Sequence, residues 1–313
     1  MALVAMAACG RTPLDSTAGG GTLQNPDSGS WDAGLAGRGG SVRDGAATAE
    51  GGATATMTSG FTQISAGAEY ACGLRPGGTA TCWGDNSYGQ AVPPVGMFTQ
   101  ISAGWYHTCG LRTDGSATCW GDNSYGQSIP PAAAFTQISA GGTHTCGLSA
   151  DGSASCWGEA YASASTPSTG TFTQISAGGT HTCGLDIDGS VSCWGYNGNG
   201  QASPPAGTFT EVSAGAFHTC GLRADGSASC WGDNSYGQAA PPAGTFTQIS
   251  AGWGHTCGLR ADSTAACWGR NEYGQATPPA DTFTQISAGG VQTCGLRADG
   301  SATCWGNLAA PDS

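Results

Sequence analysis

A repeat of fixed length dominates this sequence. Each unit opens with a phenylalanine, and successive units begin 37 residues apart, at Phe61, Phe98, Phe135, Phe172, Phe209, Phe246 and Phe283. The seven units align without insertion or deletion and share the consensus F-T-Q-I-S-A-G-x-x-H-T-C-G-L-R-x-D-G-S-A-T-C-W-G-D-N-S-Y-G-Q-x-x-P-P. In chains of this kind one small structural unit stacks against the next, because no single unit can bury its own apolar face.

Each unit is predicted to contain three short strands and no helix. Residues 62–65 of the first unit form the first strand, and residues 107–112 and 116–120 of the second unit show the other two. The last two strands are joined at residues 113–115, where Gly115 can take the left-handed conformation that a tight hairpin needs. The Gly-Gln-x-x-Pro-Pro part is predicted to be an outer edge strand or a connector, because proline donates no hydrogen bond to a sheet.

Seven such units predict an all-β fold, a seven-bladed β-propeller of 37-residue repeats, with an open solenoid as the alternative. The last unit lacks a Gly-Gln-x-x-Pro-Pro part, and an alternating segment, residues 53–58, precedes the first unit. We expect this segment to fill the outer position of the last blade and so to close the ring.

Fourteen of the fifteen cysteines lie in the repeat, always with nine residues between the two members of a pair. Around a three-residue hairpin loop this spacing places the two cysteines directly opposite each other, with Cα atoms about 4.5 Å apart, within reach of a disulfide. Zinc sites usually space cysteines two to four residues apart, so metal binding is the weaker interpretation. One disulfide per blade is predicted: Cys72–Cys82, Cys109–Cys119, Cys146–Cys156, Cys183–Cys193, Cys220–Cys230, Cys257–Cys267 and Cys294–Cys304.

The disulfides restrict the compartment in which this chain is expected, and its charge restricts the class of partner. Disulfides persist in oxidising compartments, so an extracytoplasmic location is expected. The chain has 21 acidic residues, nine arginines and no lysine, and its formal net charge is −12. This balance argues against nucleic acid as a partner, because phosphate binding needs clustered basic side chains. No apolar run is long enough for a transmembrane helix.

The first 57 residues differ from the repeat in composition. Residues 1–9 end in Ala-Ala-Cys and resemble the end of a bacterial lipoprotein signal, so Cys9 is the predicted lipidation site; ordinary secretion is the alternative. Residues 10–57 are rich in Gly, Ala, Ser, Thr and Asp and are predicted to be a disordered tether, followed by the propeller over 58–313. An outer-membrane or cell-surface lipoprotein, attached to the membrane only through Cys9, is the resulting expectation.

No catalytic or metal-binding constellation stands apart from the repeat. The five histidines, at 107, 144, 181, 218 and 255, share one repeat position, where Tyr70 and Gln292 replace them. A metal ring would need compensating ligands, so a structural role, bonding backbone groups between blades, is favoured. The tryptophans of the Cys-Trp-Gly motif are expected in the core, and the Asp-Asn-Ser-Tyr-Gly-Gln segment is expected to form an Asx turn rather than a calcium loop. We therefore expect no enzyme activity, no cofactor and no metal.

The positions that vary between units carry the candidate binding residues. Two residues vary after each Ala-Gly, and large aromatic side chains there are typical anchors of protein interfaces. The loops after Trp-Gly vary as well and are expected on the same rim. The predicted partner face contains Glu69, Trp105, Tyr106, Phe217 and Trp253 from the first loops, and Glu159, Tyr161, Tyr196, Arg270, Glu272 and Tyr273 from the second. The alternative is that these side chains only cap the ends of the blades.

The motif A-G-x-x-H-T-x-x-L-x-x-D-G-x-x-x-x-W-G-x-N-x-x-G-Q, matched in phase over residues 61–306, resembles the repeat of the regulator-of-chromosome-condensation (RCC1) superfamily. The Trp-Gly-Asp-Asn-x-Tyr-Gly-Gln element is most similar to secreted bacterial seven-bladed members, such as the type II β-lactamase inhibitory protein. This resemblance implies a seven-bladed propeller that binds a protein through loops on one face. The third unit departs from the motif, with Glu159-Ala160-Tyr161-Ala162-Ser163 in place of Asp-Asn-Ser-Tyr-Gly.

Together these observations predict a monomeric, extracytoplasmic, non-enzymatic binding protein whose partner is another protein. A carbohydrate or surface polymer is the alternative ligand, because exposed Trp and Tyr side chains also stack on sugar rings. Guanine-nucleotide exchange, the eukaryotic activity of the superfamily, is a further alternative by family name only. A disulfide-rich, acidic chain without lysine suits neither the compartment nor the chromatin surface of that activity.

Overall fold

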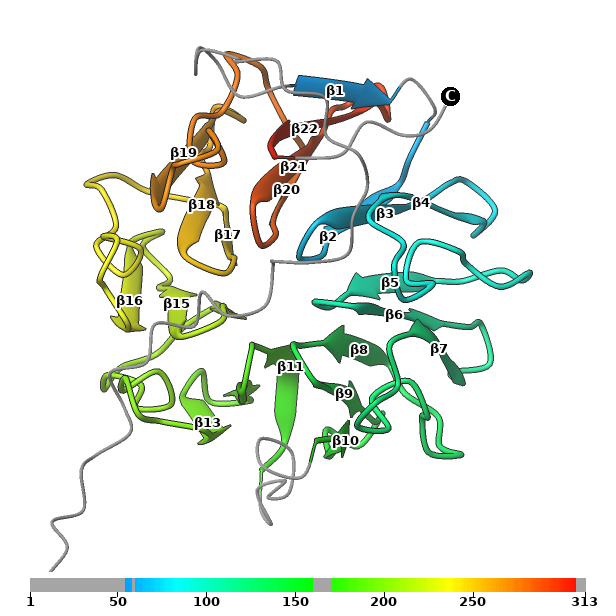
Figure 1. Ribbon diagram of the computed structural model, residues 1–313. Coiled ribbons are helices and arrows are strands. Elements are labelled where there is room, and N and C mark those ends of the chain that lie inside the picture. The colour runs from blue at the N-terminus through cyan, green and yellow to red at the C-terminus, as the bar shows by residue number, and fades with distance from the viewer. Residues whose placement is uncertain (1–53, 58–59, 160–169, 308–313) are drawn as a thin grey trace, which may run out of the picture. The chain divides into compact units, whose positions relative to one another are not determined.

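The computed structural model describes residues 54–57, 60–159 and 170–307. The chain divides into two compact units, Met1–Thr48 and Ala49–Ser313, and all described residues belong to the second. These residues form seven antiparallel sheets arranged around a common centre, which is the predicted propeller (Figure 1). They include no helix, and hence none that could cross a membrane. Cys9, with the rest of the predicted signal remnant and most of the tether, lies outside the described residues.

Each blade has three strands in chain order from the centre outward, and the middle strand pairs with both of its neighbours. The inner strands are β2 (Gln63–Ala66), β5 (Gln100–Ala103), β8 (Gln137–Ala140), β11 (Phe172–Ala177), β14 (Glu211–Ala214), β17 (Gln248–Ala251) and β20 (Gln285–Ala288). The middle strands are β3 (Tyr70–Leu74), β6 (His107–Leu111), β9 (His144–Leu148), β12 (His181–Asp186), β15 (His218–Leu222), β18 (His255–Leu259) and β21 (Gln292–Leu296). The outer strands are β4 (Ala80–Gly84), β7 (Ala117–Gly121), β10 (Ala154–Gly158), β13 (Val191–Gly195), β16 (Ala228–Gly232), β19 (Ala265–Gly269) and β22 (Ala302–Gly306).

The hairpin between middle and outer strands carries the disulfide. Cys109 and Cys119 are direct partners in the register of β6 and β7, with Cα atoms 4.0 Å apart. All seven predicted disulfides are present, and the Cα–Cα distance is 4.0 or 4.1 Å in each. The turn itself depends on Gly115, whose φ is 82°, and on Asp114, whose Oδ1 accepts a hydrogen bond from the Ser116 amide. The Gly-Gln-x-x-Pro-Pro part is a connector, since it forms no strand in the described repeats.

Two side chains of each inner strand bond the blades to one another. The amide of Ile101 donates to Gln63 Oε1 of the preceding blade at 2.9 Å, and the amide of Ala103 donates to Ser65 Oγ at 2.9 Å. The same two bonds recur at every blade junction, including the junction between the last blade and the first. Strands of neighbouring blades do not pair through their backbones, so these side chains provide the hydrogen bonds between the sheets.

The apolar core lies between neighbouring blades. Cys72 and Leu74 of the first blade pack against Phe98 and Ile101 of the second. Each unit's Phe also contacts its Trp, with ring centroids 5.5 to 5.8 Å apart. Gly110 is required beneath this ring, because a Cβ there would lie 2.4 Å from Phe98 Cδ1. The tryptophans of the Cys-Trp-Gly motif are therefore buried or half-buried core residues, as predicted.

The last blade has a fourth strand, supplied from before the first repeat. Strand β1 (Thr54–Met57) pairs antiparallel with β22, and Thr56 lies opposite Thr303. This is the closure expected of residues 53–58, of which 54–57 are described. The outer strand β22 is buried along its length, whereas the other outer strands are mostly half-buried. The propeller sheet therefore includes residues 54–57 of the predicted tether.

Candidate partner-binding face

The two variable loop sets lie on one face of the propeller, as their backbone bonds show. The amide of Asp85, in the loop after β4, donates to the carbonyl of Glu69, in the loop between β2 and β3. Corresponding bonds join Asp122 to Tyr106 and Asp233 to Phe217. We call this surface, formed by the Ala-Gly-x-x loops and the Trp-Gly loops, the loop face. The opposite surface, formed by the turns between middle and outer strands, is the hairpin face.

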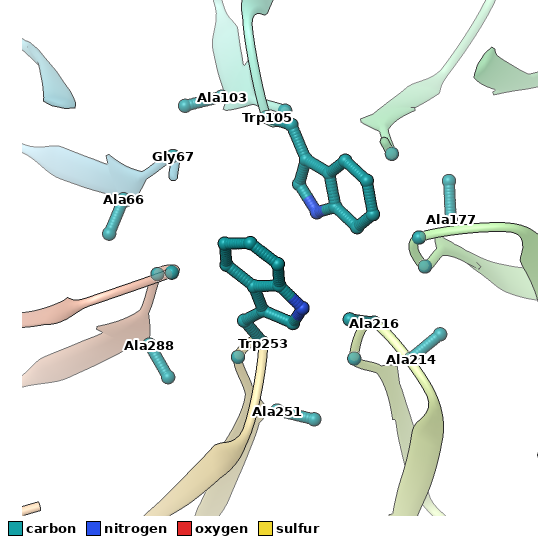
Figure 2. A pocket seen from close by; sticks show the side chains of 18 of the residues that line it. Ala66, Gly67, Ala103, Trp105, Ala177, Ala214, Ala216, Ala251, Trp253 and Ala288 are labelled. Atoms are coloured by element: carbon teal, nitrogen blue, oxygen red, sulfur yellow. The ribbon is translucent and has the colours of Figure 1, made fainter. Parts of the chain in front are cut away.

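At the centre of the ring, the Ala-Gly loops surround a cavity of about 80 Å³ (Figure 2). Neighbouring loops are bonded head to tail: the amide of Trp105 donates to the carbonyl of Gly141, and that of Trp253 donates to the carbonyl of Gly289. Small residues line most of the cavity, and a Cβ on Gly141 would lie 2.3 Å from the next blade's carbonyl oxygen. Glycine is therefore required here by the close approach of two loops.

Trp105 and Trp253 face each other across this cavity (Figure 2). Their ring centroids are 5.6 Å apart, and the interplanar angle is 30°. Glycines in other blades make room for them, since a Cβ on Gly142 or Gly179 would lie 3.0 or 2.7 Å from the Trp105 indole. Both tryptophans are half-buried at the axis. Each therefore presents only part of its surface to solvent, unlike the rim anchor predicted from the sequence.

An acidic and aromatic cluster lies where the first two blades meet. The rings of Tyr88 and Tyr106 are 5.2 Å apart between centroids. Burial, and then the nearby Asp85 carboxylate, raise the pKa of Glu69. Burial also raises the pKa of Tyr106, followed by the charges of Glu69, Tyr88 and Asp85. We call these four residues the Glu69 cluster.

A second cluster lies between the fifth and sixth blades. The Arg270 guanidinium stands 5.3 Å from the centroid of the Tyr236 ring, and its Nη2 donates to Glu272 Oε2 at 2.5 Å. Gly254 lies beside this arrangement, since a Cβ there would be in ordinary van der Waals contact with it, 3.4 Å from Arg270 Cβ and 3.6 Å from Tyr236 Cδ2. The predicted residues Arg270 and Glu272 are thus brought together.

The other predicted residues stand apart from these clusters. Phe217 is half-buried in the loop between β14 and β15, and Tyr196 is exposed after β13. Glu159 Oε2 accepts a hydrogen bond from Thr143 Oγ1 at 2.5 Å. Tyr161 lies outside the described residues.

Three exposed tyrosines, Tyr88, Tyr125 and Tyr236, were not among the residues predicted for the partner face. The Asp-Asn-Ser-Tyr-Gly-Gln segment was predicted to be a turn, and it is one: Asp85 Oδ1 accepts from the amide and hydroxyl of Ser87, and Asp85 Oδ2 accepts from Gln90 Nε2. These bonds leave the tyrosine side chain outside the turn. With Tyr196, five tyrosines of the Trp-Gly loops are exposed: Tyr88 (54%), Tyr125 (52%), Tyr196 (43%), Tyr236 (52%) and Tyr273 (41%). Tyr88, Tyr125, Tyr236 and Tyr273 recur at one repeat position, and this recurrence was the available signal, whereas Tyr196 stands at the repeat position of Asp85.

The histidines bond blades to one another, but to a hydroxyl rather than to a backbone group. His107 Nε2 lies 2.8 Å from Thr145 Oγ1 of the next blade, and the other four histidines make the same contact. Burial lowers the pKa of each to about 3 or 4, so they are neutral. Nowhere in the described parts of the chain do three or more His, Cys, Asp or Glu side chains form a group that could hold a metal ion.

The two exceptions to histidine keep the same function. The hydroxyl of Tyr70 donates to the carbonyl of His107 at 2.6 Å and lies 2.9 Å from Thr108 Oγ1. At the junction between the last blade and the first, Ala71 stands where the other units have threonine. Gln292 therefore reaches backbone instead, and its Nε2 donates to the carbonyls of Gly67 and Tyr70 at 3.0 and 2.9 Å.

Solved structures of similar fold include two plant receptor ectodomains. One is the entire ectodomain of the receptor kinase CR4 of Physcomitrella patens, at 28% identity and TM-score 0.68, covering 82% of this chain and 75% of that one. Another is the CRINKLY WD40 ectodomain of the Arabidopsis thaliana receptor kinase ACR4, at 28% identity and TM-score 0.67, covering 80% and 96%. This likeness, with seven disulfides, indicates an extracellular protein.

A third similar structure, Prp20p of Saccharomyces cerevisiae, is 15% identical, with a TM-score of 0.62 over 80% of this chain and 82% of that one, and shows the fold alone. No curated protein matches the sequence. The family model described as the Regulator of chromosome condensation (RCC1) repeat matches residues 61–90, 98–127, 135–160, 172–201, 209–238 and 246–275, more than half of the chain. The chain therefore belongs to the RCC1 repeat family.

Proposed function

We propose that this chain is an extracellular, non-enzymatic binding protein that recognises a protein partner through the loop face. The observation that carries the proposal is the set of five exposed tyrosines, all on that face. Tyrosine offers a large contact area and a hydroxyl at low cost in side-chain entropy, and it is enriched in protein interfaces. Asp and Gln side chains hold the turns that carry these tyrosines. Binding therefore costs little entropy for ordering the loops.

The opposite surface offers no comparable set. Among the described residues, Ile187 is the one large apolar side chain exposed at a hairpin turn, and the remaining exposed aliphatic residues lie in the connectors. A partner that needs aromatic anchors therefore meets them on the loop face. We expect the protein to bind its partner as a monomer, since the ring is closed within one chain and needs no second copy to complete it.

A carbohydrate ligand is the second candidate, and the axial tryptophans favour it. Their indoles line the cavity, and a sugar ring could stack on an exposed indole face. However, the two indoles already cover part of each other, and the cavity lining is mostly Ala and Gly without polar side chains to orient hydroxyl groups. Guanine-nucleotide exchange is suggested by the family name alone, and none of the described residues argues for it.

The finer location is also a proposal. Attachment of lipid to Cys9 would place the propeller at a bacterial outer membrane or cell surface, with the first residues as a tether. The likeness to the type II β-lactamase inhibitory protein stays a prediction, since inhibition would depend on loop side chains rather than on the shared scaffold.

A comparison of three full-length, oxidised baits tests the function. The first is unchanged, the second carries Tyr88→Ser, Tyr125→Ser, Tyr236→Ser and Tyr273→Ser, and the third carries Ile187→Ser on the hairpin face. We expect a protein from envelope extract to be crosslinked to the first and third baits and lost from the second, with crosslinks on the loop face. Equal capture by all three, or binding to glycans in place of protein, would contradict the proposal. Unchanged melting temperatures show that the baits are folded.

A further inference from the structure

Charge is divided unevenly between the two faces. Five of the six described arginines lie at the hairpin turns, and four of these guanidiniums stand over phenylalanine rings. The loop face has one arginine, Arg270, and it is already paired with a carboxylate. Its acidic residues are Glu69, Asp85, Asp122, Glu159, Asp233 and Glu272. The face that presents the tyrosines is therefore strongly acidic.

The second cluster shows how this face holds a cation. The Arg270 guanidinium lies over the ring of Tyr236, a residue of the preceding blade, and bonds to Glu272. An aromatic face and a carboxylate together are a favourable environment for a guanidinium, through the ring quadrupole and a charged hydrogen bond. This internal example needs no partner, because the chain supplies its own arginine.

The Glu69 cluster has the same setting without the cation. The repeat places Tyr88 at the position of Tyr236, Tyr106 at that of Gly254, and Asp122 at that of Arg270. Two tyrosine rings therefore stand beside two carboxylates, Glu69 and Asp85, with no arginine at the equivalent position.

The Glu69 carboxylate is half-buried beside Asp85, and no described donor bonds to it. A partly desolvated carboxylate next to a second one is costly unless a cation compensates it. A cation placed here would offset that cost, and the chain has no lysine to provide one.

We propose that the Glu69 cluster binds a cationic side chain of the protein partner, so that the loop face recognises an arginine- or lysine-bearing segment. The inference rests on the proposed function and names the chemistry of the partner. Arginine fits better than lysine, because a planar guanidinium can stack on Tyr88 or Tyr106 while it donates to a carboxylate. Two aromatic walls with only two carboxylates suit an organic cation better than a calcium ion, which takes six to eight oxygens.

Calorimetric titration of the full-length, oxidised chain with short synthetic peptides tests this. One peptide alternates arginine with serine, a second alternates lysine with serine, and a third alternates glutamate with serine. We expect the arginine peptide to bind, the lysine peptide to bind more weakly and the glutamate peptide not to bind. Glu69→Gln and Tyr106→Ala should each weaken the arginine peptide roughly tenfold, and added salt should weaken it further.

The matched control is Asp114→Asn, which removes a carboxylate from the hairpin face and keeps the side-chain oxygen that the turn uses. Binding that falls equally in Glu69→Gln and Asp114→Asn would reduce the effect to net charge and overturn the inference. So would absence of binding by the arginine peptide. In either case, loss of the crosslinked protein from the tyrosine-substituted bait would still support the loop face as a binding surface, so the two proposals fail separately.

Discussion

At the residue scale, one substitution in the ring of inner-strand glutamines stands out. Gln63 bonds the next blade with both ends of its amide, since Oε1 accepts from the Ile101 amide and Nε2 donates to the Ile101 carbonyl at 3.1 Å. In the fifth blade this position is Glu211, whose Oε1 accepts from the Ile249 amide at 3.3 Å. Burial raises the pKa of Glu211 to about 7. A protonated carboxyl can imitate the glutamine amide, whereas an ionised one cannot donate.

Replacement of Glu211 by glutamine should therefore stabilise the protein in a pH-dependent way. The unfolded chain releases this proton near pH 4.5 and the folded protein near pH 7, so the folded state binds more protons between these values. The wild-type contribution to stability accordingly falls as pH rises from about 4.5 to 7 and stays low above. We expect Glu211→Gln to gain roughly 1–3 kcal/mol at pH 8 and little at pH 4.5, measured by denaturant unfolding. The same gain at both pH values would exclude the ionisation as its cause.

Ser263 is the second residue at odds with its repeat. It occupies the hairpin position that is glycine in the other units, and its φ is 68°. A side chain in this left-handed region costs about 1 kcal/mol relative to glycine. Ser263→Gly should raise the free energy of unfolding by about that amount, and the reverse change Gly226→Ser should lower it by a similar amount. Chemical unfolding of the two variants beside wild type measures both, and a loss in Ser263→Gly would contradict the argument.

At the scale of the strand, the middle strands are bonded across the blades by a short relay. Thr145 Oγ1 donates to the carbonyl of Gln127 at 3.0 Å and therefore accepts from His107 Nε2. The indole of Trp157 donates to the same carbonyl at 3.0 Å. This relay assigns the proton of His107 to Nε2 and leaves Nδ1, which has no described partner, as an acceptor. An unpaired acceptor in the core costs less than an unpaired charged donor would, so the imidazole stays neutral.

Acid should therefore destabilise the propeller steeply. The unfolded chain binds protons on its five histidines below about pH 6.5, whereas in the folded protein these histidines stay neutral down to about pH 3 or 4. The unfolded state then binds more protons, and stability falls as pH drops from about 6.5, by up to roughly 1.4 kcal/mol per pH unit for each histidine. Five histidines outweigh the opposite trend of Glu211. Denaturant midpoints at pH 7.5 and pH 5 measure this loss of stability. The variant His218→Gln should reduce the loss by about a fifth. An unchanged wild-type midpoint would contradict the argument, because it would show that the folded protein takes up protons on its histidines as readily as the unfolded chain does.

How far the sequence predicts each element depends on how local its contacts are. The hairpin, its turn at Gly115 and the Cys109–Cys119 disulfide lie within eleven neighbouring residues, so spacing alone predicts them. The stacking of Trp105 on Trp253 joins loops of two distant blades, and it depends on ring size and on the small residues between them. Only the closed ring reveals that contact. Tyr88, Tyr125 and Tyr236 escape prediction for a different reason, because binding residues are sought at positions that vary between units, whereas this tyrosine recurs.

At the scale of the whole molecule, the ring is closed at the junction between the last blade and the first. The last blade bonds the first through Gln285 and Ser287, as every junction does, and through Gln292, which takes the place of the histidine at other junctions. Strand β1 adds a backbone ladder on the outer side, pairing with β22, and Met57 packs against the core cluster that contains Phe61. Residues from before the first repeat thereby hold the last repeat in place, and the two ends of the array depend on each other.

Removal of residues 53–58 should consequently loosen this junction first. The deletion exposes the edge of β22 and uncovers apolar side chains, so the melting temperature should fall, by roughly 2–4 °C for each kcal/mol lost. Deletion of residues 20–25, which has the same length, is the control and should leave the melting temperature unchanged. Hydrogen exchange should locate the loss in β20 to β22, because the other blades keep their own contacts. Addition of a peptide with the sequence of residues 53–58 should restore protection there, if backbone pairing is what β1 contributes. Equal exchange in every blade would instead show that the ring opens as one cooperative unit, and β1 would then stabilise the whole propeller rather than its last blade.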